Sequence, residues 1–293
     1  MPDGSVAPSS EDLFHRRLAA FNASRFTPGL PHPDWEADLE GQCAMLLEEG
    51  RWLEGFRALV SERASEAPRD PAGFVAWFEA LEHTGPGQGD PLFPWLAEQA
   101  SLEEMRWFLT QEVAGEAGFE DLTAVTQVRL PQRPKLELAR NYWDEMGRGN
   151  AKGMHGPMLE TLARALKLTP KVETTVWESL ALANTMAGLA CSRRYAFHSV
   201  GAMGVIEQTA PGRSAMVARG LKRLGVKAAD RHYFDLHAVL DIKHSAAWNA
   251  EAAWPLVEAR PELAPALAEG ALMRLECGAA CFRRYRKELG VPG

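Results

Sequence analysis

The stretch HAVLDIKH, residues 237–244, places His237, Asp241 and His244 at successive spacings of four and three residues. An α-helix turns by about 100° per residue, so these offsets bring the three side chains into an arc of roughly 60° on one helical face. Two imidazoles and a carboxylate on one face are ligands that iron accepts. The flanking residues are apolar, and buried ionisable groups are costly unless they are paired or bind a metal. Surface helices also carry such triplets, so a metal site requires further ligands from elsewhere in the chain.

Apolar residues recur at spacings of three and four along almost the whole chain, and no segment shows the alternation of a strand. This pattern predicts an all-α fold. The segment TGPGQGDP, residues 84–91, is the strongest break in composition. We expect it to separate an N-terminal helical extension, residues 1–84, from a helical bundle domain, residues 85–293. Helices are expected over about 35–49 and 51–65 in the extension. In the bundle domain we expect one helix over about 92–115 and one bent helix over about 172–208 that ends before Pro211.

One candidate acid lies in the expected helix over residues 92–115. Glu112 shares a face there with Met105, Phe108 and Leu109. Glu116, one turn further, shares the same face, so either acid could be the functional carboxylate. The alternative is that both acids are solvated at the end of a helix.

Glu145 and His155 stand ten residues apart in a glycine-rich segment. Glycine costs about 1 kcal/mol relative to alanine inside a helix, so this segment predicts a local unwinding or bulge. Such irregularities commonly mark functional sites. The alternative is a loop that joins two helices, with Glu145 at the end of the first and His155 at the start of the next. The glycines are Gly147, Gly149, Gly153 and Gly156.

Glu207 ends an apolar stripe of its helix, formed by Ala196, Val200, Met203 and Gly204. His198 would point to the opposite side of a continuous helix, so we interpret it as a packing or surface histidine. Bundle cores hold di-iron sites with carboxylates and histidines that project inward from facing helices. The candidate ligands, four acids and three histidines on apolar faces, are Glu112, Glu145, His155, Glu207, His237, Asp241 and His244. Such a set suffices for two irons and leaves positions open for dioxygen.

Three runs of the sequence resemble motifs of the haem-oxygenase-like non-haem di-iron oxidases and oxygenases, also called iron-containing redox enzymes. They are NYWDEMGRG (141–149) with His155 after it, GAMGVIEQTAP (201–211) and HAVLDIKHSAAW (237–248). The resemblance covers about residues 91–293 and implies a seven-helix haem-oxygenase-like bundle. It also implies that the seven residues above bind two Fe(II) ions, with O₂ as co-substrate and Glu145 and His237 in catalytic positions. Glu112 is the least specific of these assignments, because Glu116 fits the pattern nearly as well.

The family implies an O₂-dependent oxidoreductase that acts on amino acids or small carboxylates. The reactions are N-oxygenation, desaturation or carbon–carbon cleavage, often in natural-product biosynthesis. Asn141, one turn before Glu145, is either a hydrogen-bond donor to a ligand or a surface amide. Two rival hypotheses remain open: a cofactor-independent or haem-binding helical oxidase, and a metal-free helical interaction protein.

The net charge of −7 and the lack of a clustered basic face argue against a nucleic-acid partner. The first twenty residues contain acids and no apolar core of a secretory signal, and the apolar run over residues 180–190 is too short to span a bilayer. We therefore expect a cytoplasmic protein without a membrane partner. The N-terminal extension is expected either to pack on the bundle or to mediate homodimerisation.

Overall fold

The computed structural model describes residues 8–116 and 118–292 of the 293-residue chain. Within these residues the fold is all-α, as predicted, and no β-strand occurs. None of the described helices combines the length and the apolar character that a membrane crossing requires. The helices are α1 (Ser10–Phe26), α2 (Trp35–Ala64), α3 (Pro71–Thr84), α4 (Leu92–Glu98), α5 (Leu102–Gly115), α6 (Phe119–Thr126), α7 (Gln132–Glu145), α8 (His155–Leu166), α9 (Trp177–Cys191), α10 (Ala196–Arg223), α11 (His232–Trp248), α12 (Trp254–Ala259) and α13 (Ala264–Leu289).

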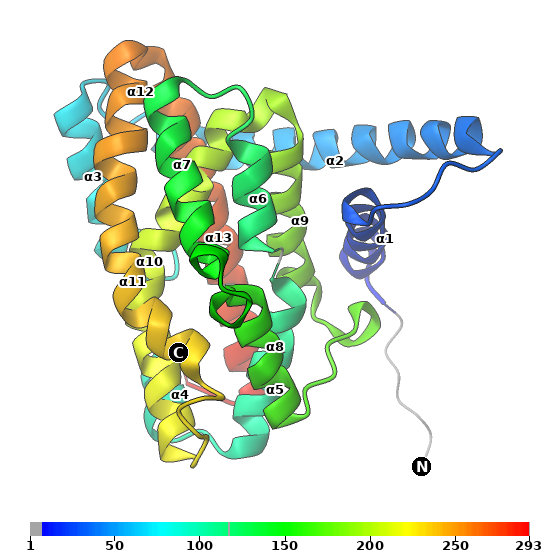
Figure 1. Cartoon of the computed structure of the whole chain (residues 1–293), viewed down its shortest axis with the longest axis vertical. Coiled ribbons are helices and arrows are strands. Elements are labelled where there is room, and N and C mark those ends of the chain that lie inside the picture. Colours follow the sequence, from blue (N-terminus) through cyan, green and yellow to red (C-terminus); the bar gives the residue numbers. More distant parts are fainter. Residues whose placement is uncertain (1–7, 117, 293) are drawn as a thin grey trace.

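Figure 1 shows α7, α9, α10, α11 and α13 along the long axis of a helical bundle. Glycines let α10 and α13 cross closely at its centre. Gly201 of α10 lies against the backbone of Leu267, and Gly270 of α13 lies against the backbone of His198, so a Cβ atom at either glycine would overlap the other helix. This crossing fixes the depth of α10 in the bundle. Glu207, six residues beyond Gly201, is thereby held in the interior, where it is 3% exposed.

The N-terminal extension packs on the bundle over part of its length. Phe56 and Val60 of α2 and Phe74 and Phe78 of α3 belong to the same buried core as residues of α9, α10 and α13. The first half of α2 projects away from the bundle (Figure 1), and Trp35 there is 58% exposed. The separation of the predicted helices near Gly50 was wrong, because α2 runs without interruption through this glycine. The division of the chain at Thr84 stays a prediction.

Two further helix predictions were wrong at points where a tertiary or capping interaction decides the outcome. The expected helix over residues 92–115 is divided into α4 and α5, because the Ser101 hydroxyl accepts a hydrogen bond from the backbone N–H of Glu104 and begins a new helix. The expected bent helix over residues 172–208 is divided at Ser192, which has extended backbone angles. Arg193 then donates hydrogen bonds to the carbonyl groups of Val125 and Thr126 at the end of α6.

Pro211 does not end a helix, as the sequence had led us to expect, but lies inside α10. A proline has no N–H for the carbonyl group four residues earlier, which here is that of Glu207. Neighbouring helices hold α10 before and after the proline: Gly201 lies against Leu267 of α13, and Gly220 lies against Leu96 of α4. The backbone next to Glu207 therefore lacks one hydrogen bond of a regular helix.

Candidate metal centre

Six of the seven predicted ligands meet inside the bundle, and we call them the acid–histidine cluster. They come from the end of α7, the start of α8, the middle of α10 and one face of α11. Their ligand atoms form two groups, Glu145 with His155 and His237, and Glu145 with Glu207 and His244. Within each group the atoms lie within 4.8 Å of one another. Glu145 belongs to both groups, which gives the cluster two adjacent places for an ion. The cluster consists of Glu145, His155, Glu207, His237, Asp241 and His244.

A short loop brings Glu145 and His155 together. Helix α7 ends at Glu145 and α8 begins at His155, so the loop alternative is what the structure shows. Met146 and Met154 pair in one antiparallel bridge, and Gly147, with φ of 60°, packs against the backbone of Gly153 so closely that no Cβ atom would fit. The loop thus folds back on itself. As a result, His155 Nδ1 lies 2.6 Å from Glu145 Oε2.

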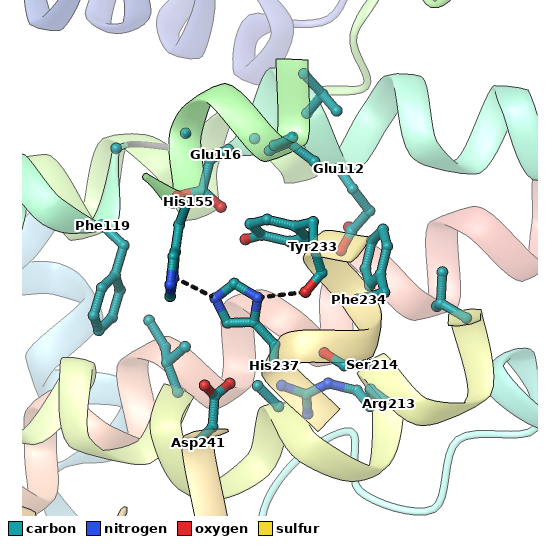
Figure 2. Close-up of a pocket in the computed structure, with 18 of the residues that line it drawn as sticks. Glu112, Glu116, Phe119, His155, Arg213, Ser214, Tyr233, Phe234, His237 and Asp241 are labelled. Carbon is teal, nitrogen blue, oxygen red and sulfur yellow. Dashed lines mark hydrogen bonds between the residues drawn. The ribbon is translucent and has the colours of Figure 1, made fainter. Parts of the chain in front are cut away.

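The orientation of His237 is set by its own helix. Its Nδ1 donates a hydrogen bond of 2.7 Å to the carbonyl oxygen of Tyr233, one turn earlier on α11. This bond leaves the lone pair on Nε2, which faces His155 Nδ1 at 3.1 Å (Figure 2). A histidine that ligates a metal commonly donates its other ring N–H to a carbonyl or carboxylate group in this way.

His244 and Glu207 are also held by neighbours. His244 Nε2 lies 3.1 Å from Asp144 Oδ2, which leaves Nδ1 directed at Glu207 Oε2, 3.4 Å away. Asp144 in turn accepts a hydrogen bond of 2.6 Å from Arg148. Asn141 is 1% exposed and donates a hydrogen bond to Glu207 Oε1. Of the two alternatives for Asn141, the donor is therefore confirmed.

In the metal-free cluster, burial and mutual repulsion disfavour the charged form of the carboxyl groups. Burial, with the charge of Glu207, raises the pKa of Glu145 well above its ordinary value. The same two causes raise the pKa of Asp241 to about 9. These acids would hold protons at neutral pH to limit the repulsion, and a divalent cation would take the place of those protons.

The three histidines fall into two classes. Burial lowers the pKa of His155 to about 4, with a contribution from the charge of His244. Burial and the neighbouring His155 likewise lower the pKa of His237 to about 4. For His244, burial favours the neutral ring, but the nearby carboxylate of Glu207, with that of Asp144, outweighs burial and raises the pKa to about 9. Two imidazoles are thus already in the neutral form that binds a metal, and the third becomes available when its proton is displaced.

Two buried polar atoms of the cluster lack a hydrogen-bond partner in the part of the chain that the structure describes. They are Asp241 Oδ1 and His244 Nδ1. An unsatisfied buried polar group costs about 1–3 kcal/mol. Imidazole and carboxylate donors with open positions suit iron, and a cation in the cluster would give both atoms a partner. The residues present therefore fit iron ions.

Glu112 is the predicted ligand that the structure places apart from the cluster. Its Oε1 accepts a hydrogen bond of 2.9 Å from the Tyr285 hydroxyl, and the nearest charges are those of Arg274 and Arg213. Glu116 lies nearer the cluster. Its carboxyl group lines the cavity, and desolvation there, with the charges of Glu120 and Glu145, raises its pKa to about 7. The two acids do not share a helical face as predicted, because α5 ends at Gly115 and Glu116 follows it with extended backbone angles.

A cavity of about 220 Å³ opens onto the cluster. Acids and histidines line one part of it, and most of the remaining wall is apolar. Tyr233 also faces the cavity (Figure 2), and burial together with the charges of Glu116 and Glu145 raises the pKa of its hydroxyl well above the ordinary value. Apolar wall residues include Phe108, Leu109, Phe119, Leu159, Leu182 and Ile206.

Three residues near the cluster were not predicted from the sequence. Asp144 orients His244 and pairs with Arg148, four residues later in the loop that follows α7. Tyr233, four residues before His237, could have been placed on the same face of α11 by helical spacing. Glu120 lines the cavity next to Gly156, but it lies in the short helix α6, which carries no pattern that would have indicated its direction.

Comparisons with known proteins agree with this geometry. The model of the iron-containing redox enzyme family matches residues 106–279. Two crystal structures of a CADD-like protein of unknown function from Nostoc punctiforme are similar in fold. The first has a TM-score of 0.54 and 16% sequence identity, and the match covers 83% of this chain and 98% of that structure's chain. The second has a TM-score of 0.51 and 18% sequence identity, and the match covers 83% of this chain and 96% of that structure's chain.

At such low identity the likeness to these structures shows the fold alone, an all-α bundle of the haem-oxygenase-like kind. No curated protein matches the sequence. The family model spans more than half of the chain and includes all six residues of the acid–histidine cluster. The chain therefore belongs to the family of iron-containing redox enzymes.

Proposed function

We propose that the acid–histidine cluster binds two Fe(II) ions and that the protein uses them with O₂ to oxidise a small amino-acid-like or carboxylate substrate. The observation that carries this proposal is that Glu145 belongs to both groups of ligand atoms. A carboxylate shared in this way would help to hold both ions, as carboxylates do in the di-iron sites of other helical bundles. Membership of the iron-containing redox enzyme family supports the choice of metal.

Bound Fe(II) would supply the electrons for the reduction of O₂. The side chains of the protein bind the ions and orient them. His155 and His237 would hold one ion with Glu145, and His244 and Glu207 the other, with Asp241 beside Glu207. These side chains need little movement to bind, because backbone, aspartate and amide partners already fix His237, His244 and Glu207.

The cavity next to the cluster is the place for the substrate. Its apolar wall excludes bulk water from the oxidation. The Tyr233 hydroxyl keeps its proton at neutral pH and faces the same space, so it can donate a hydrogen bond to a polar atom of the substrate. Within this scheme the reaction is N-oxygenation, desaturation or carbon–carbon cleavage, in natural-product biosynthesis.

Iron analysis under anaerobic conditions tests the proposal. Protein purified without O₂ and loaded with Fe(II) should retain about two irons per chain after desalting. Admission of O₂ should then produce a transient visible absorption and consume O₂. His237→Ala should lose both signals while its far-UV circular dichroism stays that of the wild type.

Other outcomes identify the rival functions. Wild-type protein that binds haem alone, or that consumes O₂ without any metal, would replace the proposal with a haem-binding or cofactor-independent oxidase. Wild-type protein that binds no metal and consumes no O₂ would leave a helical interaction protein.

A further inference from the structure

Two guanidinium groups face the cavity without an acid bound to either. Arg213 of α10 and Arg274 of α13 both line it. Arg213 donates hydrogen bonds to the neutral oxygens of Thr209, at 3.0 Å, and Gln88, at 3.4 Å. The Nε atom of Arg274 is buried and has no hydrogen-bond partner. Over residues 8–116 and 118–292, neither guanidinium lies within 4.0 Å of a carboxylate oxygen.

Several other partly buried arginines of this protein are paired with an acid, while Arg63 and Arg106 donate to backbone carbonyl groups instead. Arg25 lies 2.9 Å from a carboxylate oxygen of Glu49, and Arg57 lies 2.7 Å from one of Glu269. A guanidinium removed from water is costly without such a partner. Arg213 and Arg274 differ from all of these because they line a cavity, where a partner from outside the chain can reach them.

The charge at this end of the cavity is positive. Glu112 is the acid whose charge acts on both guanidiniums, but its carboxylate accepts the hydrogen bond of Tyr285, and burial raises its pKa. Burial and the repulsion of Arg274 lower the pKa of Arg213 to about 9, so its guanidinium remains charged at neutral pH. Arg274 also acts on the charge of Glu116, but neither guanidinium has a carboxylate in direct contact, so one further anion would give the two cations a partner.

Apolar rings lie beside this charge in the cavity. Figure 2 shows Arg213, Glu112 and Phe234 on one side of the view and His155 and Asp241 on the other. The phenyl rings of Phe93 and Phe282 lie under Arg213, with 5.9 and 5.6 Å from the guanidinium carbon to the ring centroids. A ligand that reached from the arginines to the cluster would thus need an anionic end and an apolar body.

We propose that Arg213 and Arg274 form a subsite for the carboxylate of the substrate, with the apolar body of that carboxylic acid extending along the cavity toward the acid–histidine cluster. Two guanidiniums offer the forked donors that a carboxylate accepts in a bidentate manner. This inference rests on the proposed function for the oxidation itself, but binding of the acid requires no iron. The expected substrate is thus a monocarboxylic acid whose carboxylate binds the two arginines and not the metal ions.

Binding to the metal-free protein tests the subsite separately from the metal centre. Hexanoate, hexan-1-ol and hexylamine share one apolar chain and differ in the end group. After treatment with a chelator, the wild-type protein should bind hexanoate in calorimetry and show a raised Tm with it. The alcohol and the amine should bind at least about tenfold more weakly, since a charge-assisted hydrogen bond contributes about 1.5–3 kcal/mol.

Variants then assign the subsite to the two arginines. Arg213→Gln and Arg274→Gln should each lower the affinity for hexanoate about 10- to 100-fold. Arg274→Lys, which keeps the charge but not the fork, should lie between Arg274→Gln and the wild type. Arg219→Gln is the matched control, because Arg219 lies on α10 but is exposed and paired with Glu98, and it should bind hexanoate like the wild type.

Equal binding of hexanoate and hexan-1-ol by the wild type would overturn the inference even if the glutamine variants fail to fold. Unchanged affinity in both folded glutamine variants would overturn it as well. Neither result would bear on the number of irons bound, and absence of iron binding would leave the hexanoate result standing.

Discussion

Helix α10 contributes to two buried pairings of acid and histidine, and they differ in how their charge is balanced. His198 Nε2 lies 2.8 Å from Glu269 of α13, and Arg57 of α2 lies 2.7 Å from the same carboxylate oxygen. Nine residues further along α10, Glu207 lies in the acid–histidine cluster, where the charges that act on Glu145 and Asp241 are those of other acids and His244. One pairing contains a permanent cation, and the other does not.

The pKa of the carboxyl group records this difference. Burial alone would raise the pKa of Glu269, but the hydrogen bonds of His198 and Arg57 outweigh burial and lower it. In the acid–histidine cluster, burial and repulsion act in the same direction and raise the pKa of Asp241 to about 9. The first pairing has its cation within the protein, and His198 is buried there as a packing residue, although its Nδ1 atom has no hydrogen-bond partner among the described residues. The second has no such cation from the described residues, and the proposed metal ions would supply one.

Among the variants that distinguish the two pairings, removal of the Glu145 side chain should have the largest effect on iron binding. Glu145→Ala takes a ligand from both groups of the cluster, so we expect loss of nearly all tightly bound iron. The fall in affinity should exceed the about 10- to 100-fold that loss of an orienting partner causes. Iron per chain after anaerobic loading and desalting measures it.

His198→Ala is the control for this prediction. His198 belongs to the pairing that already contains Arg57, so its removal should leave the iron content at the wild-type level. Equal loss of iron in Glu145→Ala and His198→Ala, with both variants folded, would show that charge balance does not distinguish the two pairings.

Much of the cluster could be predicted because helical spacing is local. His237, Asp241 and His244 share a face of α11 whatever the rest of the fold does, and the structure brings them to the acid–histidine cluster. The choice between Glu112 and Glu116 could not be made in this way. Helix α5 ends at Gly115, and Glu116 follows it with extended backbone angles, so the end of the helix rather than helical spacing decides which acid lies near Glu145.

The errors in helix boundaries have a similar origin. Pro211 is a strong signal to end a helix, but packing along α10 outweighs the missing hydrogen bond to Glu207. Ser192 carries no comparable signal, and the break there depends on Arg193 reaching carbonyl groups at the end of α6. The two arginines of the cavity went unnoticed because their lack of an acid is a property of the folded protein alone.

Asp144 gives a smaller and more specific effect, because it acts on a ligand rather than as one. Asp144→Asn should weaken iron binding about 10- to 100-fold, since the amide no longer provides the charge that fixes the Nε2–H form of His244. Competition with a chelator of known affinity measures the change. Arg148→Gln removes only the outer partner of Asp144 and should weaken binding less. An equal loss in both variants would indicate disruption of the loop after α7 instead.

Glu269→Ala should affect stability and leave iron binding unchanged. The variant leaves the His198 ring and the Arg57 guanidinium without their carboxylate, and because Arg57 is about a quarter exposed we expect a loss of about 1–3 kcal/mol. Urea denaturation of the iron-free protein gives the free energy of unfolding. A lower iron content in folded Glu269→Ala would connect the two pairings through α10 and contradict their independence.

His15 of α1 is a further buried histidine, and aromatic rings rather than an acid lie against its ring. It allows the effect of pH on stability to be compared with that of the two pairings. Its ring lies between those of Trp52 and Trp177, at centroid distances of 4.8 and 5.6 Å. Burial lowers its pKa from 6.5 to about 4, so the unfolded chain binds this proton more tightly than the folded protein does. The stability that the neutral ring contributes is therefore complete above about pH 6.5 and is lost as the pH falls toward 4.

His155 and His237 change stability in the same direction in the iron-free protein, so the contribution of His15 must be measured as a difference. Between pH 6 and pH 5 the wild type should lose about 1 kcal/mol more than His15→Gln, which cannot titrate there. Urea denaturation at the two pH values provides the four free energies. Parallel losses in both proteins would mean that the ring of His15 is reached by water and that packing between two tryptophans does not keep it neutral.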